Sequence, residues 1–151
     1  MKKPMLSAIL LLSNIFFLAK AYALFCSVNS SGLSFGSFSP LTDNTADSTG
    51  TINVSCDALE SYTIALSPGG SGTYSPRLMA NGGNYLQYNL YRDAGHSQIW
   101  GNGTGGSYTV SDSILLLGSK NYTVYGRIPL STQRGAMVGN YSDSISVTVT
   151  Y

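Results

Sequence analysis

Apolar and polar residues alternate with a period of two along much of this chain, and that alternation constrains its fold more than any other feature. It is clearest at the C-terminus, where apolar residues alternate with hydroxylated ones; the apolar positions are Ile145, Val147, Val149 and Tyr151. A period of two places each set on its own face of a β-strand. The segment therefore predicts a strand with one buried face and one hydroxylated, solvent-facing face.

The same alternation predicts further strands, separated by clusters of Gly, Pro, Asn and Asp that form turns. Clear strands are expected over residues 52–56, 62–66, 86–90 and 122–128, and shorter ones over 25–28, 33–38, 99–100 and 108–110. No stretch has helical periodicity with caps. Residues 111–119 fit either the beginning of a strand or a buried loop. Six or seven strands at this spacing predict one all-β domain, an immunoglobulin-like Greek-key sandwich.

The N-terminus predicts export. Two lysines precede an apolar stretch over residues 5–18, and residues 21–23 (Ala-Tyr-Ala) have the small-x-small pattern of a signal peptidase site. The apolar stretch is short for a membrane-spanning helix, which needs about 20 residues. We expect a signal peptide over 1–23 and a mature domain over 24–151.

Charge and cysteine content fit an exported protein. Only 10% of the residues are charged, and removal of a lysine-containing signal leaves a slightly acidic chain without a basic surface for nucleic acid. Cys26 and Cys56, the only cysteines, both lie in the exported part, and in an oxidising compartment they predict one disulfide. Two cysteines and a single histidine are too few ligands for a metal site. We expect no metal and no cofactor.

No pattern in the sequence predicts catalysis. His96, the only histidine, lies in a predicted turn and is expected to be an exposed loop residue; no Gly-x-Ser-x-Gly motif accompanies any serine. Residues 101–106 match Gly-x-Gly-x-x-Gly, but strand-like residues follow where a dinucleotide site needs a helix, so we expect a glycine-rich loop. Asp43 and Asp47 are expected to bind calcium weakly at most. The five Asn-x-Ser/Thr triplets are expected by chance in a chain rich in Ser and Thr.

A series of short fragments occurs in a specific order over nearly the whole of residues 24–151. They are Cys26-x-Val28, Leu33-Ser34-Phe35-Gly36 with Phe38 and Pro40, Gly50-x-Ile52-x-Val54-x-Cys56, Tyr62-x-Ile64-x-Leu66, Arg77-x-Met79, Leu86-x-Tyr88-Asn89-Leu90-Tyr91-Arg92-Asp93, Trp100-Gly101, Tyr125-Gly126-Arg127-Ile128-Pro129, Gly139-x-Tyr141-x-Asp143 and Val147-Thr148-Val149-Thr150-Tyr151. Each fragment is weak alone, but their order and spacing together are specific. The series resembles the spore coat protein U family, which includes pilins of archaic (Csu-type) chaperone–usher pili.

The resemblance implies an incomplete immunoglobulin-like fold that lacks its last strand. Family pilins have a hydrophobic groove beside the final strand, which a periplasmic chaperone fills first. The N-terminal segment of a neighbouring subunit then replaces the chaperone at an outer-membrane usher. By this resemblance, the donor-strand groove is lined by Ile145, Val147, Val149 and Tyr151, and the partners are a chaperone, an usher and neighbouring pilins. The implied function is a structural or adhesive subunit of a surface fibre, exported through the periplasm and active in adhesion or biofilm formation.

One departure from the family concerns the N-terminus. Polymerising subunits carry a donor segment of alternating residues ahead of the first cysteine, whereas only Leu24 and Phe25 separate the predicted cleavage site from Cys26. Our hypothesis is therefore a subunit that accepts a donor strand without donating one, at a chain end such as the tip.

Two other functions stay open on sequence grounds. One is a spore or cell coat protein that assembles without an usher. The other is a secreted carbohydrate-binding module in which Tyr74, Tyr85, Trp100 or Tyr108 forms a sugar platform, although aromatic residues of sandwiches more often pack in the core. A secreted hydrolase is less favoured, because nothing in the sequence specifically supports it.

Overall fold

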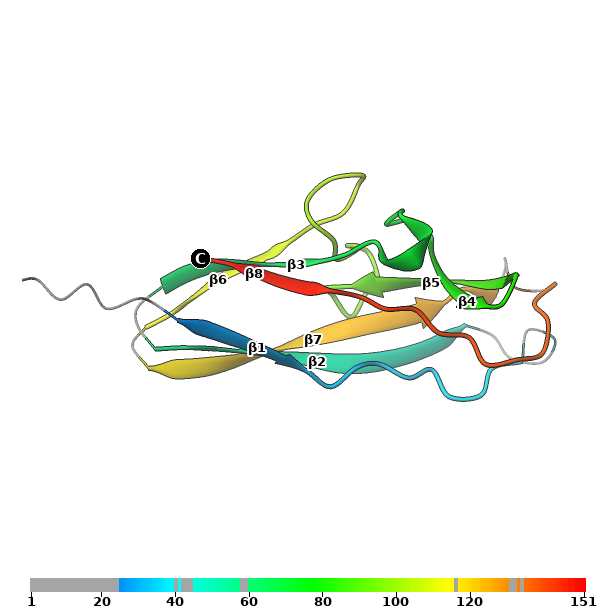
Figure 1. The fold of residues 1–151 in the computed structure, drawn as a ribbon, viewed down its shortest axis with the longest axis horizontal. Coiled ribbons are helices and arrows are strands. Elements are labelled where there is room, and N and C mark those ends of the chain that lie inside the picture. Colours follow the sequence, from blue (N-terminus) through cyan, green and yellow to red (C-terminus); the bar gives the residue numbers. More distant parts are fainter. Residues whose placement is uncertain are drawn as a thin grey trace, which may run out of the picture.

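The protein folds as two β-sheets packed face to face, as the alternation predicts (Figure 1). The computed structural model describes residues 25–39, 41, 45–57, 60–115, 117–130, 133 and 135–151. The strands are β1 (Cys26–Ser30), β2 (Ala46–Cys56), β3 (Glu60–Leu66), β4 (Arg77–Asn81), β5 (Asn84–Tyr91), β6 (Val110–Ile114), β7 (Gly118–Ile128) and β8 (Val147–Thr150), with one 3₁₀ turn, η1 (Gly69–Ser71). One sheet has the order β1-β2-β7-β5-β4 and the other β6-β3-β8.

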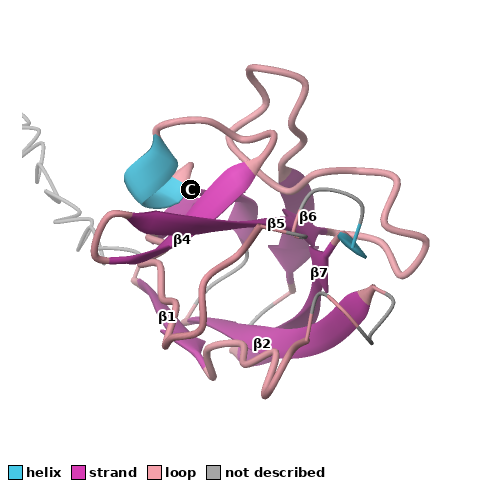
Figure 2. Ribbon diagram, turned by 90° about the vertical axis from the view of Figure 1, so that its right-hand side faces the viewer, coloured by secondary structure: helices cyan, strands magenta, loops and turns pink. Residues whose placement is uncertain are grey.

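The core lies between the two sheets and is built from the inward residues of alternating strands. Ile52 and Val54 of β2, Ile64 and Leu66 of β3, and Ile128 of β7 are at most 2% exposed. Their neighbours in sequence are mostly polar and at least partly exposed, as a half-buried strand requires. Viewed from one end of the molecule, strands of both sheets surround this common interior (Figure 2).

A disulfide joins Cys26 to Cys56, as expected. The two residues lie opposite each other in the β1–β2 pairing, so the bond fixes the first strand to the edge of the larger sheet. It closes a separation of 30 residues, which contributes about 3–4 kcal/mol in the chain-entropy account.

The predicted strands differ from the structure in four places. Residues 99, 100 and 108, expected in short strands, form only isolated bridges. Residues 33–38 form no strand but run as an extended segment over the interior. β4 was not predicted, although the turn that joins it to β5, Gly82-Gly83, was, and Gly82 has the positive φ of 58° for which glycine is suited. The stretch 111–119 is not a buried loop: it contains the end of β6 and the beginning of β7, and Leu115 and Leu117 between them are 75% and 80% exposed.

Two expectations concern residues 1–24, which lie outside the described part of the chain. These are the signal peptide with its cleavage site, and the position at a chain end that depends on the processed N-terminus. Among the described residues, no helix has the length and apolar character needed to cross a membrane.

Candidate functional site: an open groove beside the last strand

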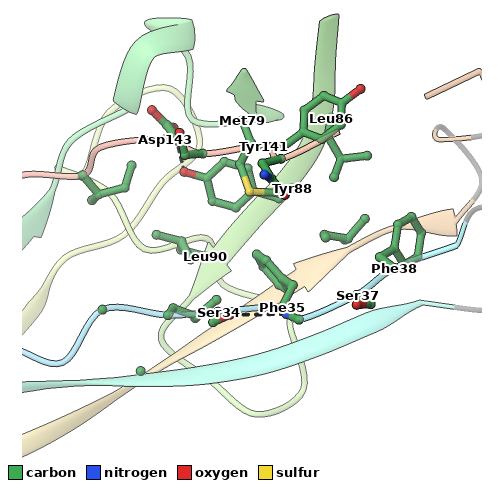
Figure 3. A pocket seen from close by; sticks show the side chains of 18 of the residues that line it. Ser34, Phe35, Ser37, Phe38, Met79, Leu86, Tyr88, Leu90, Tyr141 and Asp143 are labelled. Atoms are coloured by element: carbon green, nitrogen blue, oxygen red, sulfur yellow. Dashed lines mark hydrogen bonds between the residues drawn. The ribbon is translucent and has the colours of Figure 1, made fainter. Parts of the chain in front are cut away.

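A long groove of about 850 Å³ opens between the first and the last segments of the described chain (Figure 3). One wall is the extended segment 31–39, which carries Leu33, Phe35 and Phe38 inward. The other wall is the segment 141–147 that leads into β8. The floor consists of core side chains: Leu66, Met79, Leu86, Tyr88, Leu90, Val124 and Ile128. These floor side chains are each at most 8% exposed, so the groove reaches down to the hydrophobic core of the sandwich along one side.

The first wall lies close to the sheet because glycines lie beneath it. A Cβ added to Gly50 would stand 2.5 Å from the carbonyl oxygen of Gly32, and one added to Gly126 would stand 2.7 Å from the Leu33 side chain. Neither position leaves room for a side chain. Gly50 and Gly126 thus let Leu33 and Phe35 pack directly on β2 and β7.

The second wall is attached to the fold along one edge only. Ser142 exchanges two backbone hydrogen bonds with Ala80 of β4, and the Ser67 amide donates to the Ser146 carbonyl over 2.9 Å. From there β8 pairs with β3, with Thr148 opposite Ala65 and Thr150 opposite Thr63. Because the backbone groups of successive residues point to opposite edges of a strand, Ile145, Val147 and Val149 direct theirs toward the other edge, which borders the groove at Ile145 and Val147. In the described part of the chain, no strand pairs with that edge.

The second wall pairs with β4 at Ser142 and with the end of β3 from Ser146 onward. A buried arginine, Arg77, lies where the pairing changes from one strand to the other. The Arg77 guanidinium, 0% exposed, donates to the carbonyl oxygens of Ser67 and Trp100 and to the side-chain oxygen of Asn89. It also lies over the ring of Tyr74 at 5.3 Å. Burial lowers the pKa of Arg77, yet guanidinium groups stay charged in proteins. Arg77 thereby fixes Ser67, the residue whose amide binds the groove wall.

The carboxylate of Asp143, near the beginning of the second wall, accepts three hydrogen bonds. The Tyr88 hydroxyl donates to one carboxylate oxygen of Asp143 over 2.7 Å, and the amides of Gly70 and Ser144 donate to the other oxygen over 2.9 and 2.8 Å. Asp143 thus connects the wall to η1 and to the floor. Burial, followed by the hydrogen bond to Asp143, raises the pKa of Tyr88 above its ordinary value.

The four residues expected at the groove occupy different places. Ile145 and Val147 line it, and Val149 packs half-buried against the core beyond the lining residues. Tyr151 is 51% exposed and lies with Thr150 and Tyr62 at a separate surface hollow.

Most of the groove consists of residues that sequence reasoning did not assign to it. The floor residues are inward positions of β3, β4, β5 and β7. Apart from Met79 of the unpredicted β4, their alternation identified them as core without indicating that one side of the core is open. Leu33, Phe35 and Phe38 stood among the family fragments, but the period of two suggested a strand rather than a wall. The rim adds Leu41, Met137 and Val138, which are 85%, 63% and 103% exposed.

One expectation about a ring side chain is wrong, and one residue is removed from the alternative of a sugar platform. His96 lies in a turn, with a φ of 54°, but its side chain is only 10% exposed because it packs edge-on against Tyr91 and Tyr125. Trp100 is 1% exposed and donates from its indole nitrogen to the Ile64 carbonyl, so it is a core residue and not a sugar platform.

The described residues contain no cluster of three or more potential metal ligands. Asp47 pairs with Arg127, whose hydrogen bond is the main cause that lowers the pKa of this carboxyl. Asp43, its expected partner in a weak calcium site, lies outside the described residues.

The chain belongs to the Spore Coat Protein U domain family, whose model matches residues 13–148. No curated protein sequence matches the chain. One solved structure with a similar fold is described as the CsuC–CsuE chaperone–tip adhesion subunit pre-assembly complex from archaic chaperone–usher Csu pili of Acinetobacter baumannii. The TM-score is 0.61 at 19% identity, and the match covers 85% of this chain and 40% of that chain. The chain thus spans well under half the length of the chain that it matches.

Proposed function

We propose that this protein is a structural or adhesive subunit of a chaperone–usher surface fibre, and that its groove binds a β-strand from another chain. The observation that carries the proposal is the free edge of β8 beside an open, apolar groove. An unpaired strand edge beside an apolar groove is prone to aggregate unless another strand covers it. Addition of a strand satisfies the backbone groups of that edge and covers the floor in one step.

The energy of such a step follows from the floor of the groove. Each apolar side chain that an incoming strand buries contributes about 1.5–3 kcal/mol. Three or four such side chains together approach the whole stability of a small domain, roughly 5–15 kcal/mol. Ile145 and Val147 are already half-buried, so most of this gain comes from the side chains of the incoming strand. The uncomplemented subunit is therefore expected to be only marginally stable.

Family membership and the fold support the choice of partners. A periplasmic chaperone would fill the groove first, and the N-terminal segment of a neighbouring subunit would replace it at an outer-membrane usher. This role requires export through the periplasm, for which residues 1–23 would act as a cleaved signal peptide ahead of a pilin domain over 24–151. Its chemistry is main-chain pairing, with no catalytic step and no cofactor.

The test is the native mass of the protein purified from the periplasm of its own host. We expect a one-to-one complex with a second protein of chaperone size. A stable monomer would contradict strand addition. Ordered assembly of the chain alone, without a second protein, would instead favour the coat protein that the family's description names.

A further inference from the structure

The smaller sheet has a second edge strand besides β8. In the order β6-β3-β8, β6 lies at the end opposite β8, and β6 and β7 lie together on the side of the sandwich away from β1 (Figure 2). In the larger sheet β5 pairs with β7 only through residues 125–127. Along residues 118–124, no strand in the described part of the chain pairs with that edge of β7. The sandwich thus has strand edges on two sides, one at the groove and one at β6.

The inward side chains of β6 differ from those of β8 because one of them is charged. Val110 and Ile114 pack with the core, and Asp112 stands between them. One carboxylate oxygen of Asp112 accepts a hydrogen bond from the Lys120 ammonium over 2.7 Å, and the other accepts one from the Tyr122 hydroxyl over 2.9 Å. Both donors belong to β7. A charged pair therefore spans the space between the two sheets on this side.

The pair is ionised and partly hydrated. The hydrogen bond from Lys120 is the main cause that lowers the pKa of Asp112, so the carboxylate is charged at neutral pH. The side chains of Asp112 and Lys120 are 35% and 43% exposed. A strand added to β6 would cover them and remove water from both charges. Burial of an ion pair costs free energy unless new hydrogen bonds compensate, and an apolar strand side chain supplies none.

We propose that Asp112, paired with Lys120, keeps the β6 edge free of added strands and so confines strand addition to β8. An inward-pointing charge on an edge strand is one way in which proteins prevent unwanted pairing. The partner that it excludes is a second copy of this chain, whose own β6 edge would pair with this one about a two-fold axis. At β8 the inward residues Val147 and Val149 carry no charge. This inference rests on the proposed strand binding and adds the choice of edge.

The test removes the charged pair as a whole and measures self-association. The double variant Asp112→Val, Lys120→Thr is isolated from the periplasm as the wild type is, with whatever protein accompanies it, and its mass is followed by analytical ultracentrifugation over a range of concentrations. We expect the wild-type particle to contain one copy of this chain and the variant to pair, with a dissociation constant at least about tenfold lower. Amide exchange of residues 110–114 should slow in the paired variant, because the new contact lies at β6.

Two controls isolate the role of the pair. The double variant Asp47→Asn, Arg127→Met removes a surface pair that joins β2 to β7 and leaves β6 unchanged, so it should keep the wild-type mass. Tyr122→Phe removes a hydrogen bond from Asp112 but keeps the charged pair, so it should also keep that mass. Should the first double variant fail to fold, Asp112→Thr carries the same comparison with a smaller expected change.

The outcomes separate this inference from the proposed function. A folded double variant with the wild-type mass would overturn the role of Asp112 and leave strand binding at β8 intact. Self-association without slower exchange in β6 would overturn it as well, since another surface would then be responsible. A wild-type protein that is a stable monomer would overturn the proposed strand binding. The comparison of variant with wild type would still decide whether Asp112 protects the β6 edge.

Discussion

Arg77 supports the groove wall from inside the core, and its replacement by Met should destabilise the protein strongly. The guanidinium donates to two carbonyl oxygens and one amide oxygen, at distances from 2.7 to 3.3 Å. Met reproduces the aliphatic part of arginine to about the position of Nε, so Arg77→Met keeps the packing of the stem and removes the guanidinium with all of these donors. The three acceptors then lie in the protein without the donor that satisfied them.

The expected loss follows from these contacts. An acceptor that loses its partner on burial costs about 1–3 kcal/mol. Against this, the variant no longer buries a guanidinium, which is costly where no carboxylate hydrogen-bonds to it. We expect a net loss of about 3 kcal/mol, a large part of the roughly 5–15 kcal/mol that stabilises a domain. Because Ser67 would lose its support, the wall at Ser146 should loosen with it.

Urea unfolding of the protein measures this loss, with Trp100 as the probe. The chain has one tryptophan, and it is 1% exposed, so its fluorescence reports directly on the core. Arg127→Met is the matched control: Arg127 forms a surface pair with Asp47, worth at most about 1 kcal/mol. A midpoint for Arg77→Met equal to that of the wild type or of the control would refute the reasoning. Equal midpoints would mean that the free energy lost by burying the Arg77 charge equals the free energy gained from its hydrogen bonds.

Three further predictions concern the disulfide and the titrating groups. Cys26→Ser should lower the free energy of unfolding by about 3–4 kcal/mol in urea, since it opens a loop of 30 residues; an unchanged midpoint would contradict a structural disulfide. The pKa of Asp47 is lowered by Arg127, so their pair stabilises the protein above pH 4 and is lost as the pH falls. Asp47→Asn should therefore lower the free energy of unfolding by less than about 1 kcal/mol at pH 7 and leave it unchanged near pH 2. A difference between variant and wild type that stays constant across this pH range would contradict the pair. Burial and hydrogen bonds, including one donated to Asp112, raise the pKa of Tyr122, so stability should fall above pH 10 as folding resists its ionisation. The Tyr122→Phe variant should be about 1 kcal/mol less stable than the wild type at pH 7, but its free energy of unfolding should fall less above pH 10. An equal fall in both proteins above pH 10 would contradict the raised pKa of Tyr122.

The alternation in the sequence was enough to predict the class of fold and most of its strands. Ile52, Val54, Ile64 and Leu66 lie where a period of two places them, because a residue buried in a strand is apolar whichever strand lies beside it. The disulfide was predictable for a different reason, since two cysteines in an exported chain allow one pairing.

The shape of the site could not be predicted in the same way. Residues 33–38 have the alternation of a strand, yet they pair with none, because Gly50 and Gly126 lower them onto the inner face of the sheet. His96 was expected in solvent, but the turn that carries it folds back onto Tyr91 and Tyr125. The contact between Tyr88 and Asp143 joins residues 55 apart in the sequence. Such contacts depend on how the elements lie in space, which a local pattern does not report.

Amide hydrogen exchange along the last strand tests the central claim most directly. In the free protein, the amides of Ile145, Val147 and Val149 lie on the unpaired edge of β8 and of the segment that leads into it, and should exchange quickly, whereas those of Thr148 and Thr150 face β3 and should be protected. In the complex isolated from the periplasm, the first set should become protected while the second set stays unchanged. Fast exchange of Ile145, Val147 and Val149 in both states would show that no strand pairs with β8, and would contradict the account.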